Sequence, residues 1–261
     1  MNSTQLLTWF INNHIQCLFV KYGDGEYYAA NYYQGGNCDG TPYTKWLGDK
    51  VKDSFIYNSR QLHSMMGAWH DPTHQQFWES LRNENDDVPN IVPNIVHNTI
   101  NWVDFHTVLV DKETIKNKDR FDLFLAIKNS SLKKIYVANA SMGNVIPLLN
   151  INSHVVIDAK DWFETQYEAT FQSTQYEIEN DKTYKTYKSY KSYKTLILCS
   201  AGMGAKYLIS ELHKLYPQCI YVDIGSGFDL LCRGTPSRTY NPSLPLLQEY
   251  LKPLMENEKN L

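Results

Sequence analysis

Two acidic residues separated by one glycine stand where a strand-like run meets a helix-like run near the start of the chain. Residues 17–22 are mostly apolar, β-branched or aromatic, which is typical of a buried strand, and Gly23-Asp24-Gly25-Glu26 follows them. In open α/β sheets, ligands bind where strands end, because loops and helix N-termini meet there. Alternate residues of a tight turn can face one ligand, so Asp24 and Glu26 could together hold a hard cation through their oxygen atoms.

A purely structural role is the alternative for the same two acids. Asp24 would then cap the helix, and Glu26 would be a first-turn acid that faces the helix dipole. Taken alone, the local sequence favours this alternative, because acids are enriched at helix starts. The choice depends on which residues the rest of the fold places beside this turn.

A second turn, made of small residues, lies late in the chain between a strand-like run at 196–199 and a helix-like run that starts at Ala205. Its small residues let the backbone amides of Gly202, Met203 and Gly204 approach a phosphate at the helix N-terminus, with Lys206 in the first turn. The turn matches neither the full dinucleotide fingerprint nor the P-loop, which ends in Gly-Lys-Ser/Thr. A glycine turn that is merely tight is the alternative.

Strand-like and helix-like segments alternate through the second half of the chain. Near-continuous apolar strands are expected at 135–138, 155–158, 196–199 and 220–223. This rhythm predicts an α/β, Rossmann-like fold with a mostly parallel sheet and helices on both faces. The turn after the first of these strands contains Ala140 and Ser141, a weaker candidate for phosphate binding.

The first half of the chain is expected to be mainly helical around the opening strand. Helices are predicted from Ser3 or Thr4, from Thr44 to about Tyr57, after Asp71-Pro72 and over 119–128, with a short strand at 62–66.

Bulk composition limits the classes of function. The chain has 261 residues, 43% of them hydrophobic, and a net charge of −3, so no basic field attracts nucleic acid or anionic membrane. No apolar run could span a bilayer, and no leader is apparent, which predicts a cytoplasmic protein without an integral membrane segment. Five widely spaced cysteines without a Cys-x-x-Cys pair indicate reduced thiols.

We expect one Rossmann-like domain over residues 1–261, interrupted by a low-complexity insertion at about 181–194. There Lys and Tyr each recur every third residue, a period that fits neither a helix nor a strand. Lysines interleaved with tyrosines could bind single-stranded nucleic acid, but such repeats are more often solvated loops.

The motif Asp223-Ile224-Gly225-Ser226-Gly227, which follows the last expected strand, resembles the nucleotide-binding turn of methyltransferases that use S-adenosylmethionine. In those enzymes the turn ends the first strand of the fold, whereas here only a short tail follows it. This order argues against a methyltransferase, but a circularly rearranged enzyme would escape the objection, so a methyltransferase stays as an alternative function.

The opening Gly-Asp-Gly-Glu motif and the late unit of strand, small-residue turn, helix and Asp-Ile-Gly together resemble the GT-D-type glycosyltransferases. The resemblance implies that Asp24 and Glu26 are catalytic and position Mn²⁺ or Mg²⁺. Family members often carry His after Asp-Ile-Gly, where this chain has Ser226; Asp229 is the substitute candidate for a catalytic group. The resemblance further implies that the nucleotide sugar is bound by Gly23, Gly25, Ala140, Ser141, Gly202, Met203, Gly204, Lys206, Asp223, Gly225 and Ser226.

The function implied by this resemblance is transfer of a sugar from a nucleoside-diphosphate sugar to a glycan or another hydroxyl acceptor. A divalent cation or fixed donors must then neutralise the leaving diphosphate. Besides the methyltransferase, a non-catalytic module that binds a nucleotide or a glycan remains an alternative.

Overall fold

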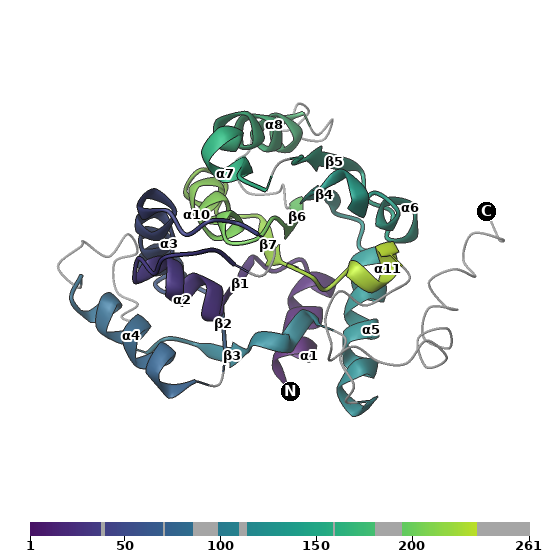
Figure 1. Ribbon diagram of the computed structural model, residues 1–261. Helices are drawn as coiled ribbons and strands as arrows, with labels where there is room; N and C mark the ends of the chain where they lie inside the picture. The colour runs from purple at the N-terminus through teal and green to yellow at the C-terminus, as the bar shows by residue number, and fades with distance from the viewer. Residues whose placement is uncertain are drawn as a thin grey trace.

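The core of the protein is a parallel β-sheet with helices on both faces (Figure 1). The computed structural model describes residues 1–37, 40–69, 71–85, 99–109, 114–158, 160–180 and 195–233. Within these ranges the sheet has seven strands, namely β1 (Cys17–Tyr22), β2 (Ser64–Ala68), β3 (Trp102–Asp104), β4 (Lys133–Ala138), β5 (Ser153–Val156), β6 (Thr195–Ser200) and β7 (Ile220–Asp223). All pairings between neighbouring strands are parallel, so the predicted Rossmann-like α/β class is confirmed.

Two separate apolar layers hold the helices against the sheet, because successive strand residues point to opposite faces. In β1, for example, Phe19 joins one layer, and Leu18 and Val20 join the other. The first layer is completed by α1 (Ser3–Asn12), η1 (Phe105–Val108), α5 (Thr114–Asn129), η2 (Ala140–Met142), α6 (Val145–Leu148) and α11 (Asp229–Arg233). The second is completed by α2 (Asp24–Ala30), α3 (Lys45–Asn58), α4 (Pro72–Asn83), α7 (Trp162–Thr165), α8 (Tyr167–Glu179) and α10 (Gly204–Leu215).

The order of the strands locates a crevice at their carboxyl ends. From edge to edge the order is β3-β2-β1-β7-β6-β4-β5. The connections β1 to β2 and β6 to β7 run in one direction along the sheet, with α2, α3 and α10 on one face, whereas β4 to β5 runs in the opposite direction, with η2 and α6 on the other. The direction therefore reverses between β6 and β4. In open α/β sheets ligands bind at the carboxyl ends of the strands beside such a reversal.

Two predicted helix starts are confirmed, and a third is shifted. Thr44 caps α3 by accepting a hydrogen bond from the Leu47 amide at 3.2 Å, and Asp71 caps α4 with Pro at the first helical position. In α1 the cap is Asn2 rather than Ser3 or Thr4, because the Asn2 side chain and the Gln5 side chain each accept a hydrogen bond from the other's backbone amide.

Several other sequence expectations concern the cysteines, the insertion and the membrane. Cys17, Cys199, Cys219 and Cys232 are free and buried, as expected for reduced thiols, and Cys38 lies outside the described residues. The segment 181–194 lies outside the described residues, so the low-complexity insertion stays a prediction. Among the residues with described structure, no helix is both long and apolar enough to cross a membrane.

A buried histidine at the end of α10 makes the stability of the fold dependent on pH. His213 is 8% exposed, its Nδ1 lies 2.9 Å from the Tyr57 hydroxyl, and burial lowers its pKa from 6.5 to about 4. Between these two pH values His213 binds a proton in the unfolded chain but not in the folded protein. Its contribution to the free energy of unfolding is therefore complete above pH 6.5 and is lost as the pH falls toward 4. We expect a loss of about 3 kcal/mol by pH 4 from this residue.

Urea denaturation of the wild type and of His213→Gln at a series of pH values checks this expectation. Glutamine keeps a polar partner for Tyr57 but does not titrate, so the variant should show a flatter profile between pH 6.5 and 4. The matched control is His63→Gln, because His63 is exposed. Parallel profiles for the wild type and His213→Gln would contradict the assignment.

Candidate functional site

The turn after β1 places the two acids of the Gly-Asp-Gly-Glu motif in different environments. The N-cap of α2 is Gly23, and the Glu26 carboxylate accepts a hydrogen bond from the Gly23 amide at 2.8 Å through Oε2. The expectation that Asp24 caps the helix is therefore wrong. The cap is Gly23, and its amide is bonded by the Glu26 side chain from the first turn of the helix. Asp24 is the first helical residue and is exposed, whereas Glu26 is buried.

The buried side of this turn forms a charged network with two other elements. The Lys206 ammonium lies 2.8 Å from Glu26 Oε1 and 3.0 Å from Asp223 Oδ2, and it donates a hydrogen bond to the Gly202 carbonyl at 3.1 Å. Lys206 is 4% exposed and Asp223 is 0% exposed. Burial opposes the protonated ammonium, but the charges of Asp223 and Glu26 outweigh it, so the pKa of Lys206 is raised. The network joins α2, α10 and the end of β7.

Asp223 has one engaged and one unengaged carboxylate oxygen. Besides Lys206, its Oδ2 accepts a hydrogen bond from the Lys21 backbone amide at 3.2 Å. Among the described residues, Oδ1 has no hydrogen-bond partner, although it is buried. Buried polar atoms in folded proteins are nearly always paired, so an unpaired carboxylate oxygen at this edge of the sheet is a place where a ligand or water is expected.

A second buried lysine, Lys21, belongs to the same region. Its ammonium donates a hydrogen bond to the Ile224 carbonyl at 3.1 Å and lies 5.2 Å from the centre of the Phe105 ring. The sequence signal for this residue is a lysine inside an otherwise apolar strand, because such a charge needs partners when the strand is buried. Lys21 is not among the site residues predicted from the sequence.

The small-residue turn after β6 is tight for two reasons. Gly202 has a φ of +59°, a left-handed conformation that favours glycine. Gly204 lies under two buried rings, and a Cβ added there would be 2.7 Å from both Phe163 Cδ2 and Trp162 Cζ2. The Trp162 indole also donates a hydrogen bond to the Ala201 carbonyl at 3.1 Å. Aromatic packing therefore sets the shape of this turn, and Lys206 points into the charged network.

Replacing Gly204 by alanine should lower the free energy of unfolding by about 1–3 kcal/mol, because the two rings are buried and the methyl group would overpack them. Chemical denaturation measures the change. Gly143→Ala is the matched control, since the nearest atom to an added Cβ there is the Ala140 carbonyl oxygen at 3.3 Å. Equal stability of both variants would show that Trp162 and Phe163 can move aside without cost.

Ala140 and Ser141 are exposed at the carboxyl end of β4, directly beside β6. Ala138 is paired with Ser200 in register, so η2 and the Gly202 turn leave adjacent strands. Because these two connections go to opposite faces of the sheet, both turns lie at the crevice described above. The structure thus brings these predicted residues to the same edge as the Lys206 network.

The turn after β7 carries the remaining predicted residues. Gly225 has a φ of +54°, and its amide donates a hydrogen bond to the Cys199 carbonyl at 3.1 Å, which ties the turn to β6. The Ser226 carbonyl accepts a hydrogen bond from the amide of Asp229, the first residue of α11. Asp229 is buried. Burial raises the pKa of the Tyr136 hydroxyl, and the charge of Asp229 makes a smaller contribution in the same direction.

Of the two acids in the opening motif, only Asp24 is accessible to a cation. Both oxygens of Glu26 are engaged, one by Lys206 and one by the Gly23 amide, whereas Asp24 faces solvent. Within the described ranges, no group of three or more His, Cys, Asp or Glu side chains could hold a metal ion. Magnesium is commonly bound by one or two carboxylates together with substrate phosphates, and Asp24 fits such a site.

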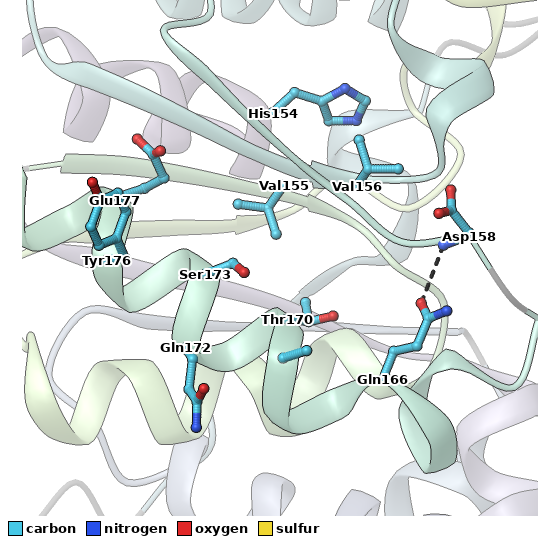
Figure 2. A pocket seen from close by; sticks show the side chains of 11 residues that line it. His154, Val155, Val156, Asp158, Gln166, Thr170, Gln172, Ser173, Tyr176 and Glu177 are labelled. Atoms are coloured by element: carbon cyan, nitrogen blue, oxygen red, sulfur yellow. Dashed lines mark hydrogen bonds between the residues drawn. The ribbon is translucent and has the colours of Figure 1, made fainter.

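A hollow of about 860 Å³ lies elsewhere, between edge strand β5 and helix α8 (Figure 2). His154, Val156 and Asp158 line it from the strand side, and Thr170 and Ser173 line it from the helix. None of the residues predicted for the site lines this hollow. In the sheet β5 lies four strands away from β1.

Comparison with known proteins finds a shared fold. No protein-family model matches the sequence, and no curated protein matches it. Two solved structures are similar over most of their length. One is described as "The highly conserved domain of unknown function 1792 has a distinct glycosyltransferase fold" (16% identity, TM-score 0.53, covering 90% of this chain and 86% of that chain). The other is a selenomethionine-substituted structure of domain of unknown function 1792 (15% identity, TM-score 0.53, covering 90% and 87%). The chain therefore has a glycosyltransferase-like fold.

Proposed function

We propose that this protein is a glycosyltransferase that moves a sugar from a nucleoside-diphosphate sugar to a hydroxyl group of a glycan or another acceptor. The observation that carries the proposal is the buried network of Glu26, Lys206 and Asp223 beside the exposed Asp24, at the carboxyl edge of the sheet. The glycosyltransferase-like fold supports it.

The two acids of the opening motif have different roles in this proposal. Glu26 fixes the turn and Lys206, so it is a positioning residue, and Asp24 faces the donor. The charges of Glu26 and Asp223 balance those of Lys206 and Lys21, so these four side chains together offer no net positive charge to a diphosphate. A Mn²⁺ or Mg²⁺ ion held by Asp24 and the donor's phosphate oxygens would neutralise the departing diphosphate.

The nucleotide part of the donor is proposed to lie at the crevice between β4 and β6. Ala140, Ser141, Gly202 and Met203 would surround it, and their backbone amides are the groups that can approach phosphates. The turn of Gly225 and Ser226 closes the crevice on the β7 side. Since α11 packs against η2, we place Asp229 on the nucleotide side, where its carboxylate can accept hydrogen bonds from sugar or base donors.

A donor screen tests the proposal. The protein is incubated with a panel of nucleoside-diphosphate sugars in the presence of Mn²⁺ or Mg²⁺, and release of free nucleoside diphosphate is measured. We expect release with at least one donor and a dependence of the rate on the cation. Chelation should abolish turnover without unfolding the protein, which a parallel thermal melt checks.

The same samples distinguish the proposed function from the two alternatives that the sequence leaves open. No release with any donor, together with tight binding of S-adenosylmethionine, would overturn the proposal in favour of a methyltransferase. Thermal stabilisation by a nucleotide or glycan without any turnover would instead indicate a binding module.

A further inference from the structure

An exposed tryptophan stands at the same edge of the sheet as Asp24, one strand away. Trp69 directly follows β2, and 39% of it is exposed. In the sheet Tyr22 is paired with Ala68, and Ala68 with Asp104, so the ends of β1, β2 and β3 are level with one another. Neighbouring strands lie about 5 Å apart, which places the chain at Trp69 next to the turn that carries Asp24.

Aromatic neighbours hold the Trp69 ring in place. Its centroid lies 5.2 Å from that of Phe105, edge to face, and 5.0 Å from that of His106. Phe105 also packs against the opening motif, since a Cβ at Gly23 would lie 2.9 Å from Phe105 Cε2. Phe105 therefore contacts both Trp69 and the buried Gly23, the residue directly before Asp24.

Polar groups border the exposed ring. The His106 Nδ1 lies 3.5 Å from the Asp104 carboxylate, which also accepts a hydrogen bond from the His106 backbone amide at 2.9 Å. Both side chains are about a quarter exposed, at 24% for His106 and 26% for Asp104. A rigid indole next to a carboxylate and an imidazole is the combination that suits a sugar ring, since the ring presents C–H groups on its face and hydroxyls at its rim.

We propose that Trp69 is the platform on which the terminal sugar of the acceptor stacks, with its hydroxyl directed toward the donor at Asp24. This inference rests on the proposed glycosyltransferase function and adds the position of the acceptor. The nucleotide lies at β4 and β6, on the other side of β1 and β7, so donor and acceptor approach Asp24 from opposite sides. Neither the hollow at β5 nor Asp229 is part of the acceptor site.

Binding of small sugars tests the platform without turnover. Saturation-transfer NMR is recorded with a panel of methyl hexopyranosides on the wild type, Trp69→Ala, Trp69→Phe and Trp9→Ala. Trp9 is the matched control, because it is 44% exposed but lies on α1, away from this edge. We expect saturation of the pyranoside ring protons in the wild type, in Trp69→Phe and in Trp9→Ala, and its loss in Trp69→Ala.

Steady-state kinetics with an active donor give a second readout. Trp69→Ala should raise the KM for the acceptor about tenfold or more, whereas Trp9→Ala should leave it at the wild-type value. Circular dichroism confirms that each variant is folded. Unchanged acceptor KM and unchanged saturation transfer in Trp69→Ala would overturn the inference, as would the absence of pyranoside binding to the wild type.

The two proposals fail in different ways. If no donor is turned over, the glycosyltransferase proposal fails, yet Trp69-dependent saturation of the pyranosides would still support a sugar platform. If donors are hydrolysed but Trp69→Ala behaves as the wild type in both assays, only the platform fails.

Discussion

Replacing Lys206 by methionine should lower the free energy of unfolding by about 3–5 kcal/mol, because the variant keeps two buried carboxylates and loses the cation between them. Methionine preserves much of the volume of the side chain, so the effect measures charge rather than packing. Urea denaturation at neutral pH gives the change.

The matched control lies on the same helix. Lys214 pairs with Glu211 near the surface of α10, where its side chain is 44% exposed. Lys214→Met should cost no more than about 1 kcal/mol, since exposed ion pairs contribute little. The double variant Lys206→Met with Glu26→Gln should recover part of the loss. If Lys206→Met is no less stable than Lys214→Met, the network does not hold the three elements together.

In the wild type, the stabilisation from Lys206 has a defined range of pH. Its pKa is raised in the folded protein, so the folded state holds the proton more tightly than the unfolded chain. The contribution is complete below the ordinary lysine pKa and is lost only as the pH rises through the raised value. At neutral pH the contribution is therefore complete.

Replacing Asp24 by asparagine should reduce turnover of the nucleotide sugar about 100-fold or more, while the fold stays intact. The expected loss follows from removing a fixed charge that acts on the cation and the diphosphate. Because the side chain is exposed, the free energy of unfolding should change by less than about 1 kcal/mol. Nucleoside-diphosphate release and a thermal melt on the same sample measure both quantities.

A titration with Mn²⁺ separates a role in cation binding from a role in donor binding alone. If Asp24 holds the cation, Asp24→Asn should need a higher Mn²⁺ concentration for half-maximal turnover. Asp122→Asn is the control and should behave as the wild type, because Asp122 lies on α5 and its side chain is about half exposed, at 47%. Wild-type turnover and Mn²⁺ dependence in Asp24→Asn would leave Asp24 as a helix-start acid without a catalytic role.

The sheet and most helices could be predicted from the sequence, because their signals are local. Buried parallel strands are apolar runs, and Thr44 and Asp71-Pro72 are strong start signals. The three-residue strand β3 was not predicted, since Trp102–Asp104 is too short to show a period and forms only by pairing with β2. The segment expected over 119–128 extends back to Thr114 in α5.

The charged network could not be predicted, because it depends on contacts between distant parts of the chain. Spacing placed Lys206 at a helix start, where a lysine is expected to face a phosphate. In the structure its side chain lies between Glu26 and Asp223, which come from the two ends of the chain. The conformation of the Gly23 turn shows the same limit: rules for single positions favour Asp24 as the cap, whereas the cap is Gly23, and Glu26 accepts the hydrogen bond of the Gly23 amide from three residues later.

The position of β7 has a consequence for how the chain folds during synthesis. This strand is made last of the seven but lies in the middle of the sheet, between β1 and β6. Until it emerges from the ribosome, β1 and β6 each keep an unpaired edge, and unpaired edges are the surfaces on which nascent chains join one another. The contact of Lys21 with Asp223 spans 202 residues, so closing the sheet is a late, non-local event. The edge that carries the candidate site and the folded sheet are thus completed in the same step.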